Sequence, residues 1–174
     1  MKSKSVKNLV VGVAATAALT FGAVSTAAAS QWNSIGGGYY DFGDNGFYLE
    51  GSAHIADQVV LTGELGDTYD TIFRLGGVFL TTAAIGDAPL FISGGYSDYS
   101  VDDGLYFGAG VTYAFDERLD GKFELVHDTA LDGFFRFRSG VAYKLDDNLS
   151  VTTSYSLNNR GVRNEFRIGV SYRF

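Results

Sequence analysis

The sequence predicts an all-β protein that folds as an antiparallel, up-and-down transmembrane β-barrel. Three observations predict this fold: apolar and polar residues alternate in ten segments, clusters of Gly, Asn and Asp separate these segments, and aromatic residues flank an aliphatic middle on the apolar face. Alternation with a period of two places successive side chains on opposite faces of a β-strand. The spacing of the segments predicts ten strands, with eight as the alternative.

The first five predicted strands follow one another along the N-terminal half of the barrel. Segment 46–55 alternates cleanly, with Leu49 on the apolar face and Glu50 on the polar face. The fourth segment alternates less cleanly, because Val78 and Leu80 fall on its polar face. The first and the fifth segments are predicted to be strands from their composition, because their alternation is less clean. The five segments are 32–42, 46–55, 57–66, 71–82 and 89–100.

The last five predicted strands include the cleanest pattern of the chain. In 164–174 one face is apolar throughout, and the other is charged or small. The connections are too short for crossovers, so neighbouring strands are expected to be antiparallel. Segments start about 15 residues apart, which favours ten strands over eight in a barrel of this length. The five segments are 105–115, 120–129, 134–145, 149–159 and 164–174.

The apolar face is predicted to point outward toward lipid, and not into a soluble core. In 105–115 aromatic residues flank Ala109 and Val111, and this zoning matches the two aromatic girdles of a membrane barrel. The opposite face combines Gly, Ser and Thr with charges of both signs. Such a face suits a narrow lumen better than a solvated surface, because Gly weakens strands. Segments of about ten residues also match a tilted membrane-spanning strand.

The first 29 residues are predicted to be a cleaved secretory signal peptide. Residues 1–8 carry three lysines and no acid, an apolar stretch follows from Leu9 to about Val24, and small residues fill 25–30. This is the order of a signal peptide. A membrane anchor is the alternative, but the apolar stretch is shorter than the ~20 residues of a spanning helix. Cleavage would leave 30–174 as the barrel, 145 residues with a formal charge of −10.

The composition limits the classes of protein to which the chain can belong. It has 174 residues, of which 46% are hydrophobic and 15% aromatic, with 23 Gly, one Pro and no Cys. The length suggests one domain, and the lack of Cys excludes a disulfide framework and a thiolate metal site. The formal net charge of −7 argues against a nucleic-acid partner, which requires a basic surface.

The end of the sequence carries alternating apolar residues with an aromatic residue in last place. They are Phe166, Ile168, Val170, Tyr172 and Phe174. This pattern resembles the C-terminal assembly signal of Gram-negative outer-membrane β-barrels, and the chain is similar to the superfamily of small outer-membrane barrels, the opacity-like or "porin family" proteins. The resemblance implies export through the periplasm to the bacterial outer membrane. It also implies contact with membrane lipid and lipopolysaccharide, and recognition by periplasmic chaperones and the barrel assembly machinery.

The same resemblance implies that the C-terminus lies in the periplasm. The outer loops then fall near 43–45, 66–70, 101–104, 130–133 and 159–163, and all are too short to offer much area for adhesion. The acids near these loops either attract cations and bridge lipopolysaccharide phosphates through divalent ions, or act only in turns. These acids are Asp44, Asp67, Asp70, Asp102, Asp103 and Asp132.

Charged residues on the polar face are predicted to form a network of ion pairs that narrows or plugs the lumen. Buried charges are tolerated when they are paired. Hairpin register is expected to place Asp128 opposite Arg136, and Glu64 close to Arg74. Solvated charges in a water-filled pore are the alternative. The expected members of the network are Glu50, Glu64, Arg74, Glu124, Asp128, Arg136, Arg138 and Arg167.

The predicted function is a structural role or a narrow, charge-lined pore for small, preferably cationic, solutes. A closed barrel that acts as a binding or interaction protein at the cell surface is the alternative. Catalysis is disfavoured, because His54 and His127 have no evident acid or serine partner. We expect no catalytic, cofactor-binding or metal site, and the oligomeric state stays open.

Overall fold

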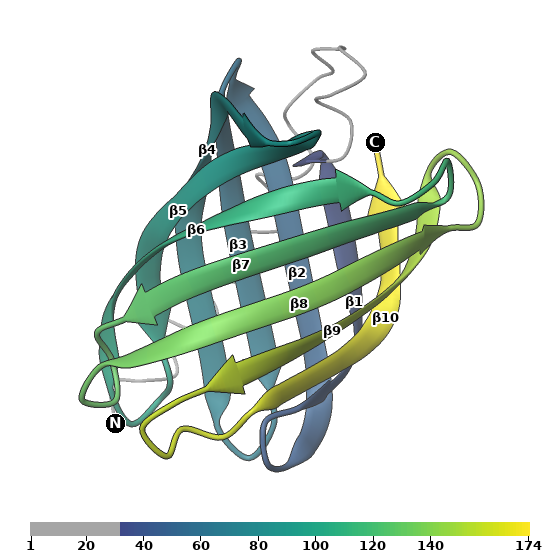
Figure 1. The fold of residues 1–174 in the computed structure, drawn as a ribbon. Helices are drawn as coiled ribbons and strands as arrows, with labels where there is room; N and C mark the ends of the chain where they lie inside the picture. The colour runs from purple at the N-terminus through teal and green to yellow at the C-terminus, as the bar shows by residue number, and fades with distance from the viewer. Residues whose placement is uncertain (1–31) are drawn as a thin grey trace.

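The computed structural model describes residues 32–174 as a closed barrel of ten antiparallel strands (Figure 1). The predicted ten strands are confirmed, and eight are excluded. The expected signal peptide at 1–29 lies outside the described residues. The strands are β1 (Ser34–Asp41), β2 (Asn45–Ala56), β3 (Val59–Asp67), β4 (Thr71–Ile85), β5 (Ala88–Asp98), β6 (Asp103–Ala114), β7 (Leu119–Asp128), β8 (Phe134–Lys144), β9 (Leu149–Asn158) and β10 (Glu165–Arg173).

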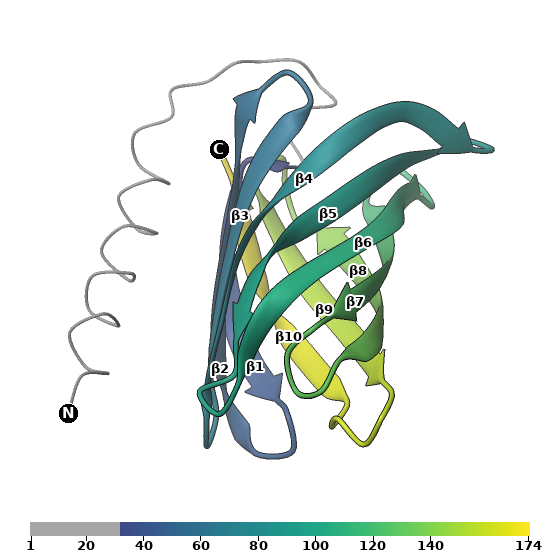
Figure 2. The ribbon, with the colours of Figure 1, turned by 90° about the vertical axis from the view of Figure 1, so that its left-hand side faces the viewer.

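Each strand pairs with its neighbours in the chain, and β1 closes the barrel against β10. β1 begins and β10 ends at the same end of the barrel, where the N–H of Phe174 donates to the carbonyl of Asn33 at 3.1 Å. We call this the turn end, and the β4–β5 hairpin extends beyond the other strands there (Figure 2). Its connections are 57–58, 86–87, 115–118 and 145–148, and those of the opposite loop end are 42–44, 68–70, 99–102, 129–133 and 159–164. Within 32–174 no helix is long and apolar enough to cross a membrane.

Two connections at the turn end are built in the same way around an aspartate. Asp146 accepts the N–H groups of Asn148 and Leu149 at 2.8 and 2.7 Å. Asp116 accepts the N–H groups of the residues two and three positions further along at 2.7 and 2.8 Å. The two N–H donors hold the pKa of the exposed Asp146 carboxyl below its usual range. These acids therefore stabilise tight turns.

The outer surface of the barrel is an apolar belt. Leu105 and Phe107 are 64% and 59% exposed, whereas Tyr40 and Phe134 on the lumen face are fully buried. Apolar side chains in such numbers on the outside require a lipid or detergent environment, because an exposed apolar surface of this extent is unfavourable in water. The apolar face therefore points outward, as the sequence predicts.

The irregular alternation of β4 has a local cause inside the barrel. Val78 faces the lumen and is buried in an apolar cluster with Trp32, Val60 and Phe91, while Leu80 packs against the cluster. The lumen wall is therefore apolar at this place, and a polar residue at Val78 would lose its contact with water. Strand alternation fails where the lumen itself holds apolar side chains.

The seam between β1 and β10 contains two glycines that face each other. Gly38 lies opposite Gly169 in the register, and the flanking positions in the same row are Tyr48 on β2 and Thr152 on β9. The Tyr48 side chain crosses both glycines, and its hydroxyl lies 3.3 Å from Oγ1 of Thr152. The side chain of one strand thereby spans the closing seam. A Cβ at Gly38 would meet the backbone of Ile168 and Gly169.

A second row repeats this arrangement on the other side of the barrel. Tyr106 on β6 lies opposite Gly95, which lies opposite Gly76, which lies opposite Thr62 on β3. A Cβ added at either glycine would meet the hydroxyl of Tyr106. The glycines of these two rows are therefore sites where an aromatic ring lies flat on the sheet, as in the aromatic rescue of glycine in designed sheets.

We expect Gly38→Ala to lower the free energy of unfolding by about 1–3 kcal/mol, because the new methyl group has only backbone to displace. Gly51→Ala is the control, since the nearest atom to its added Cβ is a carbonyl oxygen at 3.6 Å, an ordinary contact. Urea unfolding of both variants in detergent measures the difference. Equal midpoints for the two variants would mean that the seam has room to adjust.

The barrel lumen as candidate functional site

The loop end of the lumen is closed by an aromatic cap. Its members come from four strands and two loops, and together they form one buried apolar cluster. Phe42, Leu131 and Val162 from three of the loops pack against it. The Tyr99 and Phe134 rings meet edge to face, with 6.0 Å between centroids. The members of the cap are Tyr40, Tyr48, Ile72, Tyr99, Ala130 and Phe134.

Below the cap, four arginines surround two glutamates in an ion cluster. The carboxylate of Glu165 lies 2.9 Å from Arg74, 3.0 Å from Arg167 and 3.2 Å from Arg138. Arg136 is a more distant neighbour of Glu165, at 3.9 Å. The Glu165 side chain is 1% exposed. It is thus a fully desolvated charge that depends on these partners.

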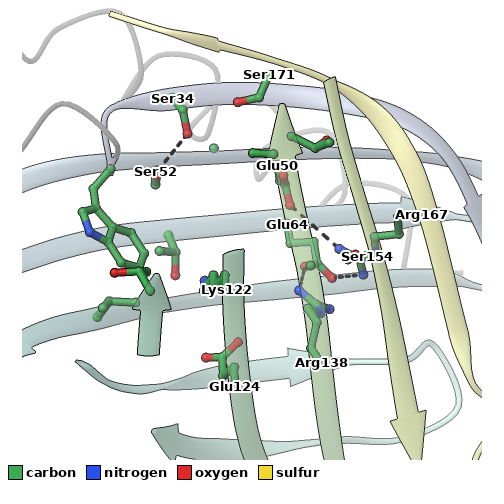
Figure 3. Close-up of a pocket in the computed structure, with 18 of the residues that line it drawn as sticks. Ser34, Glu50, Ser52, Glu64, Lys122, Glu124, Arg138, Ser154, Arg167 and Ser171 are labelled. Atoms are coloured by element: carbon green, nitrogen blue, oxygen red, sulfur yellow. Dashed lines mark hydrogen bonds and ion pairs between the residues drawn. The ribbon is translucent and has the colours of Figure 1, made fainter. Parts of the chain in front are cut away.

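The second glutamate of the ion cluster is Glu64. It forms an ion pair with Arg74, which lies directly opposite on β4, and it lies 2.7 Å from Arg167 and 3.3 Å from Arg138 (Figure 3). Glu50 lies opposite Glu64 in the register and reaches Arg167 only at 3.9 Å. The side chains that form the cluster come from β3, β4, β8 and β10, so it ties opposite walls of the barrel together.

Hydrogen bonds and ring contacts join the ion cluster to the cap. Arg74 donates to the hydroxyl of Tyr99 at 3.0 Å, and Tyr99 donates to Asp128 at 2.9 Å. The guanidinium carbon of Arg167 lies 4.5 Å from the centre of the Tyr40 ring. Such a stacked cation on an aromatic face is favourable. Cap and cluster therefore form one continuous filling of the lumen.

The part of the lumen between the ion cluster and the turn end is a cavity of about 290 Å³. Ser34 and Ser52 line the wall that β1 and β2 form, and a 3.1 Å hydrogen bond joins them. Lys122 and Glu124 on β7 also line the cavity (Figure 3). The Glu50 side chain, which also lines the cavity, is 39% exposed. Solvent therefore reaches the lumen from the turn end, while the cap closes the other end.

Trp32 covers part of the cavity at the turn end. Its ring meets Phe91 edge to face at 5.5 Å between centroids, and it is 7% exposed. Nζ of Lys122 lies 4.9 Å from the centre of the Trp32 ring and 5.1 Å from that of Phe91. The ammonium of Lys122 thus rests on two aromatic faces.

The structure brings only part of the expected lumen network into contact. Glu64, Arg74, Arg138 and Arg167 meet in the ion cluster, while Glu124 accepts a hydrogen bond from Ser93 at 2.7 Å. Glu50 and Arg136 lie at the edge of the cluster at the longer distances given above. The expected preference for cations rested on the acids at the loop end. The cavity opens at the other end, so those acids do not line it.

The expected pairing of Asp128 with Arg136 is wrong. Asp128 lies opposite Phe134, and Arg136 lies opposite Val126. The connection between β7 and β8 is two residues shorter than that pairing requires. Positive φ angles at 131–133 allow this tight turn, and strand alternation gives no sign of it.

Sequence reasoning missed several residues that fill the lumen. Glu165 is the centre of the ion cluster, although it is not among the members of the network that the sequence predicts. Tyr40 lies opposite Arg167 in the register, and Phe134 lies two positions before Arg136 on β8, so both rings share the lumen face with these arginines. Large aromatic residues at such positions indicate a filled lumen. Trp32 is the first residue of the expected strand 32–42, but β1 begins only at Ser34, so strand parity could not assign Trp32 to a face.

The two histidines lie at opposite ends of the barrel. His54 is near the turn end of β2, and His127 is near the loop end of β7 on the outer face, with its ring 5.2 and 4.8 Å from those of Phe107 and Phe135. The Nδ1 atom of each is without a hydrogen-bond partner within 32–174. In the same range, no three His, Asp or Glu side chains are grouped so as to hold a metal ion.

A closed antiparallel barrel with an apolar outer belt and a polar lumen defines the class of transmembrane β-barrels. Protein-family models and curated proteins give no match to the chain. Among solved structures, KdgM porin has a similar fold, with a TM-score of 0.54 and 14% identity over 81% of this chain and 99% of that chain. The structure of KdgM porin in complex with disordered oligogalacturonate has a TM-score of 0.55 and 15% identity, and the match again covers 81% of this chain and 99% of that chain. The N-terminal β-barrel domain of Pseudomonas aeruginosa OprF has a TM-score of 0.41 and 11% identity, and the match covers 81% of this chain and 96% of that chain.

Proposed function

We propose that the protein is an integral outer-membrane barrel with a porin-like fold and a narrow, charge-lined passage that is closed in this conformation. The observation that carries the proposal is the filling of the lumen, in which the aromatic cap and the ion cluster lie in series above the cavity. A small solute enters the cavity from the turn end and passes only when both layers rearrange. The porin that was solved with oligogalacturonate supports a solute-handling role for this barrel shape.

Conductance in planar bilayers tests the proposal. We expect the wild-type barrel to conduct little and the double variant Phe134→Ala/Arg136→Ala to show stepwise openings with several-fold higher conductance. The two side chains are neighbours on the lumen face of β8, one in the cap and one in the ion cluster, so their removal opens a path through both layers. Arg136 has the weakest contact with Glu165 of the four arginines, so the barrel tolerates its loss.

Phe135→Ala is the matched control for this experiment. Phe135 is next to both positions but is 46% exposed on the outer face, so its truncation leaves the lumen unchanged. Wild-type conductance is expected for it. A large, steady conductance of the wild type would contradict the closed lumen, as would a silent double variant that keeps the gel mobility of the folded barrel.

A structural role is the second candidate function, and the short connections at the loop end favour it over adhesion. Rare openings of the wild type at raised voltage support the closed passage, whereas a wild type that stays silent at all voltages supports the structural role. We do not propose catalysis, since the lumen residues form ion pairs and hydrogen bonds with one another and not with either histidine.

We further propose that the chain belongs with the small, opacity-like outer-membrane barrels, with the turn end in the periplasm and lipopolysaccharide around the loop end. The support is the alternating apolar pattern that ends at Phe174. Phe174→Ala is expected to reduce the amount of heat-modifiable barrel in the outer membrane of cells several-fold. The purified, refolded variant should unfold like the wild type, because the backbone bond to Asn33 stays. A normal cellular level would contradict recognition by the assembly machinery.

A further inference from the structure

The cavity carries positive charge inside an acidic protein. Its lining includes six basic and four acidic side chains. Glu165 in the ion cluster adds a fifth acid against these arginines, so a surplus of one positive charge remains, although the whole chain has a formal charge of −7. The two basic residues nearest its mouth are Lys122 and Arg173. Fields are focused in a narrow cavity with low-dielectric walls. Such a lining attracts an anion from the solution at the turn end.

The floor of the cavity has more donors than its acids can accept. Nε and Nη1 of both Arg136 and Arg167 have no hydrogen-bond partner in the described chain, nor has Nε of Arg74. Arg138 is the most exposed of the four cluster arginines, with 15% of its side chain accessible. Its three nitrogens already donate to Ser156, Glu64 and Glu165. The donors left for an additional carboxylate at the floor are therefore those of Arg74, Arg136 and Arg167, whose guanidinium groups have the planar geometry that suits a carboxylate.

The walls of the cavity add hydroxyl groups and one aromatic face. Ten serines and threonines line it, and Trp32 covers one side. These groups offer donors and acceptors to a hydroxylated molecule along its whole length. A volume of about 290 Å³ lies at the small end of the range for ligand sites. Glu50 and Glu124 also line the cavity, and they disfavour ligands with more than one negative charge.

We propose that the cavity binds a small, hydroxylated monocarboxylate of the size of a six-carbon sugar acid. The carboxylate lies between Lys122 and the arginines at the floor of the cavity, and the hydroxyl groups contact the serine and threonine walls. The inference rests on the proposed function only for the closed loop end. It names the class of solute that the cavity would receive.

Calorimetric titration of the folded barrel in detergent with gluconate tests the inference. Sorbitol, which has the hydroxyl groups without the charge, and glucosamine, which has the opposite charge, are the comparison ligands. We expect saturable binding for gluconate and at least about tenfold weaker binding for the other two, as for the loss of one charge-assisted hydrogen bond. The chain has one Trp, so a change in its fluorescence with the same midpoint places gluconate in the cavity.

Lys122→Gln and Arg118→Gln form a matched pair of variants. Both remove one positive charge near the turn end, but Arg118 is exposed in a turn and does not line the cavity. Gluconate affinity should fall at least about tenfold for Lys122→Gln and stay unchanged for Arg118→Gln. Equal binding of sorbitol, no binding of gluconate, or equal affinity of the two variants would overturn the inference. Gel mobility and bilayer conductance test the closed barrel separately, so a folded, silent barrel that fails to bind refutes this inference alone.

Discussion

Replacing Glu165 with alanine is expected to lower the free energy of unfolding by about 3–5 kcal/mol, the range for a buried ion pair that loses one partner. The carboxylate of Glu165 is in contact with Arg74, Arg138 and Arg167 and is buried at 1% exposure. Its loss leaves Arg74, Arg138 and Arg167 to share Glu64, and Glu50 reaches Arg167 only at 3.9 Å. Water cannot replace it fully, because the cap closes the lumen above.

Urea unfolding in detergent, followed by gel mobility and circular dichroism, measures this effect. Glu117→Ala is the control, since Glu117 is an exposed acid in a turn and its removal changes the net charge equally. We expect the control to stay within about 0.5 kcal/mol of the wild type, as is usual for surface positions. If Glu165→Ala were equally mild, the charges of the ion cluster would be solvated rather than mutually stabilised.

Leu125→Arg is expected to destabilise the folded barrel by about 2–4 kcal/mol in lipid, the cost of a charged side chain near the middle of a bilayer. Leu125 is 53% exposed on the outer face of β7, with Ala109 and Phe137 opposite it on the neighbouring strands. Both of these neighbours are apolar, so neither offers an arginine a polar partner. Unfolding in lipid vesicles measures the cost.

Leu145→Arg makes the same chemical change at the edge of the belt. Leu145 follows β8 at the turn end and is 51% exposed, so the arginine reaches water and costs about 0–1 kcal/mol. A difference in exposure therefore cannot explain a difference in stability between the two variants. Equal losses for both would contradict a membrane around the belt.

The fold was predictable because the outward and inward faces of every strand differ in polarity. The clean alternation of 164–174, for example, predicts β10 to within one residue at each end. Strand spacing then decides the number of strands, since short antiparallel connections leave one topology. The weak strand pattern in β4 has its cause in Val78, which packs in one cluster with Trp32. Such a contact joins residues far apart in the sequence, so the alternation of polar and apolar residues within one strand cannot predict it.

The lumen was predictable only in its composition. The contact of Glu64 with Arg74 follows from a hairpin, in which turn and register are local. The contact of Glu64 with Arg167 joins residues 103 positions apart and depends on the stagger of the strands around the barrel. The centre of the ion cluster, Glu165, is set by the same stagger. No pattern along a single strand carries this information.

The single mouth of the cavity has a thermodynamic consequence. A membrane separates two solutions, and a cavity that opens to one of them reaches equilibrium with that solution alone. Its occupancy then reports the concentration of a solute on that side and is independent of any gradient across the membrane. If Phe134 and its neighbours in the aromatic cap move aside, the cavity exchanges solute with both compartments. Its occupancy then depends on both concentrations, and solute can cross the membrane.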